Sequence, residues 1–590
     1  MLVALLIALL APPVEAPVVV TGQRPAERDV RDATLATEAL EVEDDPRPRT
    51  DAGALLDRAV GARVQRGGGA GRAQTVQLRG AGGQQVAVLL DEVPLHTARG
   101  DAVDLATVPL GFLDRVEVVR SAAGALYGSA AQGGVIRLRT RRFEGPAADV
   151  TLRAGAFGLW QADAGAGGGN RALDGLVALS GSRAEGDFRY VDVNGDPQRR
   201  RNADHARFAG LARGRWRPGG GRELSALVEG LADERGEPGL ESLPDLDARS
   251  QRRRLSAALG WRDPSAGGGV LPYRVDVHGQ VRRFSFSDPT PAPGAGTEGA
   301  LADLSLGARG EASYEGSAWQ RPVLAIEGRR EAAETTPGAR DEVRHGGALS
   351  GAWEVDPLSA LRLVAALRLD AVSGRDPLVV PKLGAAFRPI EPLRLRANLG
   401  RLFRDPSLDE LYFEAPGVRG NPDLRPEDGY GWDAGFTFAA SVLQVDAQVF
   451  GQRYERLIVF VPIDAWRVQA RADHGATVDG VEVGLRAAWP AIELDATWLY
   501  QDARFDAPLD TPLPLRPRHR LTGRALLPVG PAALFAHMRW QSEVTADRFG
   551  ARTLPAYALF DLGAAGPVPL PAPGQLRLSV EFRNVLDVRD

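Results

Sequence analysis

From residue 149 to its C-terminal end, the chain repeatedly alternates between apolar and polar side chains. In the segment 576–582, leucine, valine and phenylalanine alternate with Arg577, Ser579 and Glu581. Because neighbouring residues of a strand point to opposite faces of a sheet, this period of two predicts strands with one apolar and one polar face. A soluble sandwich turns its polar face to water, whereas a membrane barrel turns its apolar face to lipid. The alternation alone leaves both architectures open.

The number of these segments favours a barrel. About twenty candidate strands follow one another between Asp149 and Asp587, bounded by turn-forming residues. A sheet of that size must curl, split or close, and closure removes the unpaired edges. Long connections at 234–250, 288–299 and 405–429 are mixed with short ones, a pattern typical of outer-membrane barrels. We therefore assign residues 149–590 to one large antiparallel sheet.

Composition excludes several classes of function. The chain has no cysteine, which rules out disulfides, zinc–thiolate sites and cysteine nucleophiles. Its net charge of −5 gives no reason to expect nucleic-acid binding. No Ser-His-Asp pattern or phosphate-binding loop occurs in a supporting context. We therefore expect neither an enzyme nor a bound cofactor.

The N-terminal region predicts export. Met1–Leu10 is apolar and too short to span a bilayer as a helix, and Val14-Glu15-Ala16 offers a small-x-small cleavage site. We assign residues 1–16 to a signal peptide, although the usual basic residues before the apolar run are missing. No uninterrupted apolar run of about 20 residues follows Ala16, so we expect no transmembrane helix.

Two zones separate the predicted signal peptide from the barrel. Residues 17–50 are polar, charged and proline-bearing, and we predict a mobile periplasmic arm. Residues 51–141 have the texture of a compact α+β unit. Within that unit we expect one helix at 52–60 and strands at 74–78, 85–90 and 114–120.

Several stretches resemble motifs of one protein family. Residues 112–140 read FLDRVEVVRSAAGALYGSAAQGGVIRLRT, which closely resembles the plug-domain signature of TonB-dependent receptors. Three more stretches resemble plug motifs of the same family: LLDRAVGARVQ (55–65), VQLRG (76–80) and VLLDEVPL (88–95). Four plug motifs in order, at family-like spacings, make this resemblance specific. Four further stretches resemble barrel motifs of the family: FRDPSLDELYF (403–413), NPDLRPE (421–427), VDGVEVGL (478–485) and FRNVLD (582–587).

The resemblance implies a mainly β protein: a monomeric, about 22-stranded antiparallel transmembrane β-barrel with an N-terminal α+β plug domain inside. In the family, one more strand ending in an aromatic residue follows the motif found here at 582–587, so the last strand is apparently missing. We expect the full-length gene to extend past Asp590 by one amphipathic strand that ends in Phe, Tyr or Trp. Reading the codons downstream tests this expectation.

The family resemblance also implies a transport function in the outer membrane. We expect TonB-dependent active uptake of a scarce nutrient, either a ferric siderophore or cobalamin. The alternatives are a plugged passive or regulated porin that does not require TonB, and a soluble binding module. Residues Val18, Val19, Val20 and Thr21 resemble a TonB box, a β-prone segment that can add as a strand to the C-terminal domain of TonB. The alternative is an apolar tail left after signal cleavage.

Four charged residues are candidates for a plug–barrel latch. In the family, one arginine from each of two plug segments meets two barrel acids, and the matching positions here are Arg79, Arg120, Asp433 and Glu482. Asp433 is shorter than the glutamate usual at its position. Arginine suits such a site because it stays charged and binds carboxylates bidentately. The alternative is four unrelated charges on wet surfaces.

Two plug residues are possible ligand contacts. His96 and Arg99 lie in a plug loop that the resemblance places facing outward, although a solvated loop histidine is the alternative for His96. Asp192, Asn194 and Asp196 resemble part of a calcium loop but lack a bidentate acid at the right spacing. We therefore predict no metal site.

Overall fold

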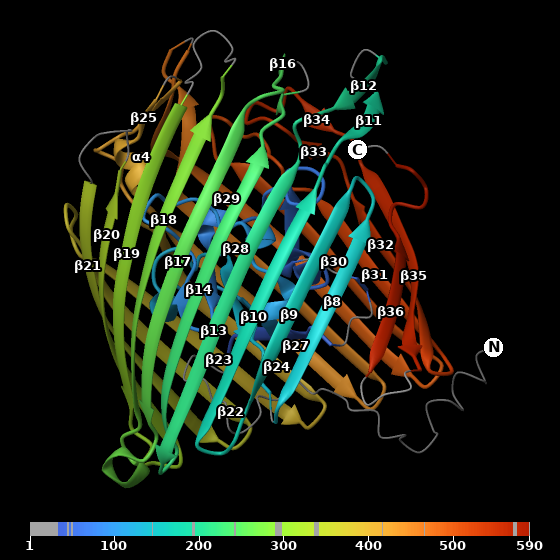
Figure 1. The fold of residues 1–590 in the computed structure, drawn as a ribbon. Helices are drawn as coiled ribbons and strands as arrows, with labels where there is room; N and C mark the ends of the chain where they lie inside the picture. Colours follow the sequence, from blue (N-terminus) through green and yellow to red (C-terminus); the bar gives the residue numbers. More distant parts are fainter. Residues whose placement is uncertain are drawn as a thin grey trace.

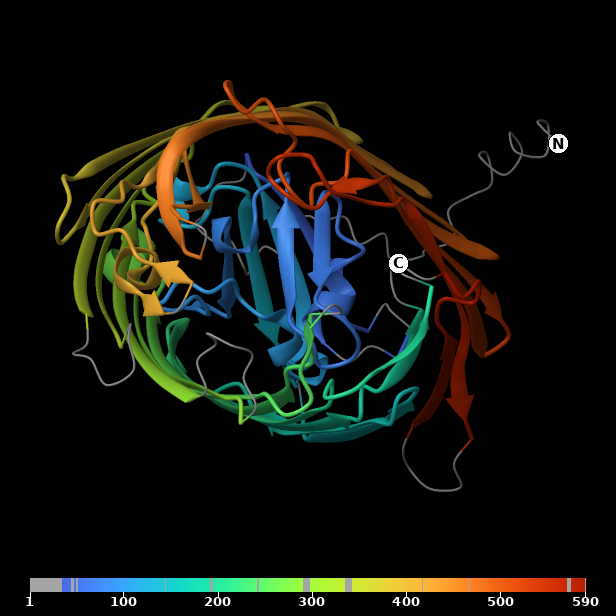
Figure 2. The ribbon, with the colours of Figure 1, turned by 90° about the horizontal axis from the view of Figure 1, so that it is seen from above.

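The computed structural model describes residues 34–43, 47–48, 51–143, 145–191, 195–240, 243–289, 298–334, 342–415, 417–464, 466–569 and 575–588. Long strands form a barrel around a small inner domain (Figure 1), and the view along the barrel shows this domain inside the ring of strands (Figure 2). The predicted signal peptide and TonB box lie outside the described residues.

The inner domain is the predicted plug. Its main sheet has the order β1-β6-β7-β4-β5, and a separate hairpin pairs β2 with β3. The bounds of its strands, helices and 3-10 turns are β1 (Ala36–Glu41), α2 (Ala52–Leu56), β2 (Ala62–Arg66), β3 (Gln74–Leu78), η2 (Gly83–Gln85), β4 (Val86–Leu90), β5 (Val93–Pro94), η3 (Leu105–Thr107), η4 (Leu110–Phe112), β6 (Leu113–Arg120), α3 (Gly124–Tyr127) and β7 (Gly134–Thr140).

Local sequence explains the start and end of α2. The carboxylate of Asp51 accepts a hydrogen bond from the backbone N–H of Ala54 at 3.1 Å, which caps the helix. The helix ends at Leu56, four residues before the predicted end, and Gly61 then adopts a positive φ of 72° that favours glycine. Leu55 and Leu56 are buried in the plug core with the valines of β4.

Strand β1 lies within the segment that we predicted to be a mobile arm. It pairs antiparallel with β6, from Ala36 opposite Arg120 to Glu41 opposite Arg115. Leu40 is buried in the plug core. The predicted boundary at residue 51 is therefore too late, because β1 belongs to the plug sheet.

Within the described ranges, the barrel sheet contains 23 strands, two of which, β25 and β26, have only two residues, and its order returns from β36 to β8. Their bounds are β8 (Ala147–Gly155), β9 (Leu159–Gly169), β10 (Leu173–Ala184), β13 (His205–Gly219), β14 (Arg222–Gly236), β17 (Arg249–Asp263), β18 (Tyr273–Ser287), β19 (Glu298–Ser313), β20 (Gln320–Ala333), β21 (Glu342–Leu358), β22 (Leu361–Val372), β23 (Leu378–Ile390), β24 (Leu393–Arg404), β25 (Glu414–Ala415), β26 (Val418–Arg419), β27 (Glu427–Ala440), β28 (Leu443–Pro462), β29 (Val468–Trp489), β30 (Ile492–Phe505), β31 (His519–Val529), β32 (Ala532–Gln541), β35 (Tyr557–Val568) and β36 (Leu576–Phe582). The predicted fold class is confirmed.

The faces of the wall strands decide between sandwich and barrel. On β22, Leu367 and Leu369 are 54 % and 46 % exposed on the outside, whereas Arg368 and Asp370, which alternate with them, are fully buried. Apolar side chains outside and charged side chains inside reverse the pattern of a soluble protein and suit a wall surrounded by lipid. Among the described helices, none is long and apolar enough to cross a membrane.

The two ends of the barrel differ in their connections. At one end, pairs such as β13–β14 and β21–β22 are joined by two-residue links, and β17–β18 by the 3-10 turn η5 (Ala266–Gly269). The other end carries α4 (Leu408–Tyr412) and small two-stranded sheets, seen at the top of Figure 1. These sheets are β11 (Phe188–Val191) with β12 (Pro197–Arg200), β15 (Gly239–Leu240) with β16 (Leu243–Pro244), and β33 (Val544–Thr545) with β34 (Thr553–Leu554). We call the two ends the short-turn end and the long-loop end.

Candidate functional site at the plug–barrel interface

The four predicted latch residues meet on one side of the plug. Arg79 follows β3 and is 2 % exposed. Its Nη2 donates to Glu482 Oε2 at 3.0 Å, and its Nη1 to Asp433 Oδ2 at 3.3 Å. The shorter Asp433 thus reaches Arg79. A further barrel residue, Gln448, accepts from Arg79 Nη2.

Arg120, the last residue of β6, completes this group. Its Nη1 donates to Glu482 Oε2 at 3.3 Å, so one fully buried carboxylate serves both plug arginines. Its Nη2 donates to Asp446 Oδ1 at 3.1 Å, and Asp446 also accepts from Arg396 Nη2 at 2.9 Å. We had not predicted Asp446 as a partner. Its place in the polar register of β28 was a signal that it faces the lumen.

The group is balanced in charge and closely packed. Three guanidinium groups (Arg79, Arg120 and Arg396) face three carboxylates (Asp433, Asp446 and Glu482). Although burial lowers the pKa of Arg79, the charges of Glu482 and Asp433 outweigh burial and raise it, which keeps the guanidinium charged. A Cβ atom on Gly61 would lie 1.9 Å from Glu482 Oε1, so only glycine admits this carboxylate. We keep the name plug–barrel latch for Arg79, Arg120, Asp433, Asp446 and Glu482.

A second contact lies about half-way round the strand order, with the charges reversed. Here the plug supplies the acids. Asp104 Oδ2 accepts from Arg235 Nη2 at 2.7 Å and from Arg252 Nη1 at 3.2 Å. Asp101 Oδ2 pairs with Arg282 Nη2 at 2.7 Å. The plug is therefore bound to β14, β17 and β18 as well as to β27–β29.

A third contact involves the end of α2. Asp57 pairs with Arg520 Nη2 at 3.2 Å and with Arg539 Nη1 at 3.3 Å, both on the barrel wall. The neighbouring Arg58 pairs with Asp495 at 3.5 Å. Although burial raises the pKa of Asp57, Arg66, Arg539 and Arg520 outweigh it and lower the pKa below its usual value. At each of three parts of the wall, at least one buried or nearly buried charge pair thus holds the plug.

His96 does not face outward, so that prediction was wrong. The chain after β5 continues alongside β4, and His96 Nε2 lies 2.9 Å from the backbone oxygen of Val86 and 3.2 Å from the nitrogen of Val88. Burial lowers the pKa of this imidazole to about 4. The His96 side chain therefore contacts the backbone of β4 inside the plug and is poorly placed to contact a ligand.

This burial makes the plug sensitive to acid. The folded-state pKa of His96 is below the ordinary value of 6.5, so the unfolded chain binds more protons as pH falls from 6.5 to 4. We expect the wild-type plug to lose stability over this window, and His96→Gln to lose less. Chemical denaturation at pH 7 and pH 5, followed through plug proteolysis, measures the difference. Equal acid losses in both proteins would contradict the prediction.

Arg99 also lies between plug and barrel. Its Nη1 donates to the backbone oxygen of Glu334 at 2.9 Å, and its Nη2 pairs with Asp409 Oδ2 at 2.7 Å. Its guanidinium carbon lies 5.7 Å from the centre of the Phe413 ring. This buried arginine is bound to connections at the long-loop end of the barrel, namely the residue after β20 and the α4 segment, and its role as a ligand contact stays a prediction.

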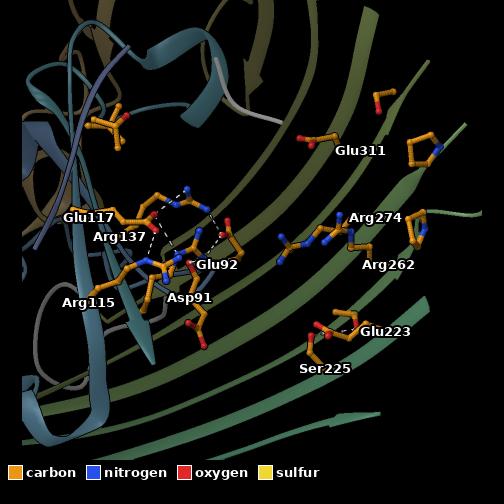
Figure 3. A pocket seen from close by; sticks show the side chains of 18 of the residues that line it. Asp91, Glu92, Arg115, Glu117, Arg137, Glu223, Ser225, Arg262, Arg274 and Glu311 are labelled. Carbon is orange, nitrogen blue, oxygen red and sulfur yellow. Dashed lines mark hydrogen bonds and ion pairs between the residues drawn. The ribbon is translucent and has the colours of Figure 1, made fainter. Parts of the chain in front are cut away.

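A cavity of about 2040 Å³ opens between the plug sheet and the barrel wall, and its lining includes Arg396, the partner of the latch residue Asp446. Figure 3 shows plug residues Arg137, Glu117 and Glu92 on one side and wall residues such as Arg274 and Glu311 on the other. On the plug face, Arg137 pairs with Glu92 at 2.7 Å and with Glu117 at 3.2 Å. The wall lining comes mainly from the short-turn end of β10 to β24. The cavity exceeds a usual ligand pocket of about 300–1,000 Å³.

Two predicted groups cannot be located in the structure. The predicted TonB box, and Asp192 and Asn194 of the possible calcium loop, lie outside the described residues. Among the residues that the structure describes, no group of three or more histidine, cysteine, aspartate or glutamate side chains is arranged to hold a metal ion.

Comparisons with known proteins match both parts of the chain. A family model described as "TonB dependent receptor-like, beta-barrel" matches residues 176–585, and the "TonB-dependent Receptor Plug Domain" model matches residues 29–135. The plug match begins before β1, in agreement with the sheet. The vitamin B12 transporter BtuB of Vibrio vulnificus is 25 % identical over 463 residues, which cover 74 % of this chain and 70 % of that protein.

Solved structures share the fold. The copper transporter OprC has a TM-score of 0.79 at 18 % identity, covering 94 % of both chains. A mutant of the ferric enterobactin receptor PfeA from Pseudomonas aeruginosa, in complex with enterobactin, has a TM-score of 0.78 at 16 % identity, again over 94 % of both chains. Since the barrel model alone matches more than half of the sequence, the chain belongs to the TonB-dependent receptors, plugged β-barrel proteins of the bacterial outer membrane.

Proposed function

We propose that this receptor actively imports a scarce nutrient and that TonB supplies the work. The observation that carries this proposal is the plug, which lies inside the barrel and is bound to three parts of its wall through charge pairs. Removing one partner of a buried pair costs about 3–5 kcal/mol. A large ligand cannot pass without displacing such contacts, so transport needs an external energy source.

The arm is the proposed point at which this energy enters. Residues Val18–Thr21 would add as a strand to the C-terminal domain of TonB in the periplasm. The arm leads into β1, which is paired along its whole length with β6. Pulling on the arm would therefore act on the plug sheet itself.

The proposed cargo is cobalamin or a ferric siderophore. The relatives described as vitamin B12 transporters match 74 % and 87 % of the chain at 25 % and 24 % identity, which supports cobalamin. The charged cavity beside the plug supports a polar cargo of either kind, because its lining offers many ionic and hydrogen-bonding groups. Passage would follow this side of the plug, where the lining residue Arg396 also contacts Asp446 of the latch.

Uptake assays in cells that express this receptor test the proposal. Labelled cobalamin and labelled ferric siderophores are supplied in strains with and without TonB, and unlabelled candidates compete. We expect one ligand class to be accumulated only with TonB. Accumulation that persists without TonB would instead support the passive or regulated porin.

A further inference from the structure

The first described residue of the chain is bonded to the barrel wall. Thr34 Oγ1 donates to Asn398 Oδ1 at 2.9 Å, and Asn398 Nδ2 donates to the backbone oxygen of Thr34 at 3.2 Å. Thr34 is fully buried, and Asn398 nearly so. The chain is therefore clamped to the wall two residues before β1 begins at Ala36.

The third member of this contact is the single lysine of the protein. The chain has 71 lysine and arginine residues together, and Lys382 is its only lysine. It is 2 % exposed, and its Nζ donates to Asn398 Oδ1 at 3.1 Å and to Thr34 Oγ1 at 3.5 Å. We call Thr34, Lys382 and Asn398 the arm joint.

The wall is shaped to receive Thr34. Gly384 lies directly opposite Asn398 on the neighbouring strand. A Cβ atom on Gly384 would lie 2.2 Å from Thr34 Oγ1 and 3.0 Å from Thr34 Cβ. The missing side chain at position 384 therefore creates the space that Thr34 occupies.

Asn398 connects the arm joint to the latch. It is the cross-strand neighbour of Asp433, and its Nδ2 also donates to Asp433 Oδ1 at 3.1 Å. Two acceptor sites and two donor hydrogens are all that an amide side chain offers, and in this arrangement Thr34, Lys382 and Asp433 use them all. Asp433 in turn holds Arg79 and accepts from Ser121 Oγ at 2.6 Å.

We infer that the arm joint couples tension on the arm to release of the plug–barrel latch, with Asn398 as the positioning residue between them. This inference rests on the proposed function, in which TonB pulls the arm. Among the described residues, Thr34 is the first that tension on the arm reaches, and its departure removes two of the four bonds of Asn398. Asn398 then no longer holds Asp433 in position for Arg79. The first residue pair of β1, Ala36 with Arg120, includes a latch residue.

The reactivity of the Lys382 amine can show whether Thr34 is in place. While Thr34 is in place, the amine is buried, and an amine-reactive ester should acylate it slowly. When Thr34 leaves, the amine loses a partner and its cover. Because no other lysine exists, peptide mass spectrometry at residue 382 reads this one event.

The purified, membrane-reconstituted receptor allows a test that needs neither TonB nor cargo. A probe pulls the N-terminal end, and the force of the first rupture is recorded. Lys382 acylation is measured in parallel without force. We expect Asn398→Ala and Gly384→Ala to lower the first rupture force and to speed acylation about ten-fold, as loss of one or two buried hydrogen bonds predicts. Gly384→Ala removes no polar group and only crowds Thr34. Comparing it with Asn398→Ala therefore separates the effect of displacing Thr34 from the effect of losing the Asn398 amide.

Gln280→Ala is the matched control, because Gln280 is an equally buried amide whose Nε2 donates to Ser256 within the barrel wall at 3.3 Å. We expect it to leave both readouts at wild-type values. If Asn398→Ala and Gly384→Ala also match wild type, the arm joint carries no load and the inference fails. Uptake that is independent of TonB would instead remove the proposed function, whatever the rupture force shows.

Discussion

Val19→Pro in the proposed TonB box is expected to reduce uptake to the level of a strain without TonB, while ligand affinity stays unchanged. Strand addition needs the backbone N–H at this position, and proline removes it. The ligand is bound by the plug and barrel, which this substitution does not touch. Uptake of labelled ligand and equilibrium binding to whole cells are measured on the same culture.

Two control variants separate strand addition from other effects. Val19→Ala keeps the N–H and should retain most of the uptake. Glu27→Pro places a proline elsewhere in the arm and should also retain it. Normal uptake by Val19→Pro would remove Val18–Thr21 as the TonB box, and loss of ligand binding would point to a folding defect.

The absence of cysteine in the sequence permits a second readout of the same contact. Single cysteines placed at positions 18 to 21 can be cross-linked to a cysteine in TonB. Because alternate residues of a strand face opposite sides, strand addition should give cross-linking that alternates along these four positions.

Much of the fold follows from local pattern. The alternation of apolar and polar residues predicted the wall strands because one face of each strand contacts lipid and the other faces the lumen or the plug. Exposed Leu367 and buried Arg368 are one example. Strand β3 has its predicted bounds, and β4 and β6 differ from theirs by one residue. Strand β1 was missed, because six residues of mixed polarity, ATEALE, become a strand only by pairing with β6.

The candidate site was harder to predict, because its partners are far apart in sequence. Arg79 and Glu482 were paired through family resemblance and lie 403 positions apart. Nothing local marks Thr34 and Asn398 as partners, since the three-dimensional course of β1 and β24 brings them together. His96 was placed wrongly because its side chain turns to the backbone of β4, an orientation that a motif match does not specify.

Removing the shared carboxylate of the latch should have the largest effect on plug stability. Glu482→Ala leaves the two buried guanidinium groups of Arg79 and Arg120 with one carboxylate fewer, and Glu482 is fully buried. Breaking a buried pair by removing one partner costs about 3–5 kcal/mol. Denaturant-induced opening of the plug, followed through protease cleavage of plug segments in the intact barrel, measures the loss.

Asp479→Ala is the matched control on the same strand. Asp479 lies three residues before Glu482 on β29 and pairs with Arg453 at 2.8 Å, but both side chains are about half exposed. An exposed pair contributes about 0–1 kcal/mol, because water screens it. A loss for Glu482→Ala no larger than that for Asp479→Ala would show that the latch adds no stability.

A double-mutant cycle assigns the loss to the latch pair itself. Arg79→Met is combined with Glu482→Ala, and the coupling is the difference between the double variant and the sum of the two single ones. If the cost of Glu482→Ala comes from an uncompensated Arg79, removing both partners should cost less than that sum. Additive losses would mean that Glu482 acts mainly through Arg120, whose Nη1 donates to the same oxygen at 3.3 Å.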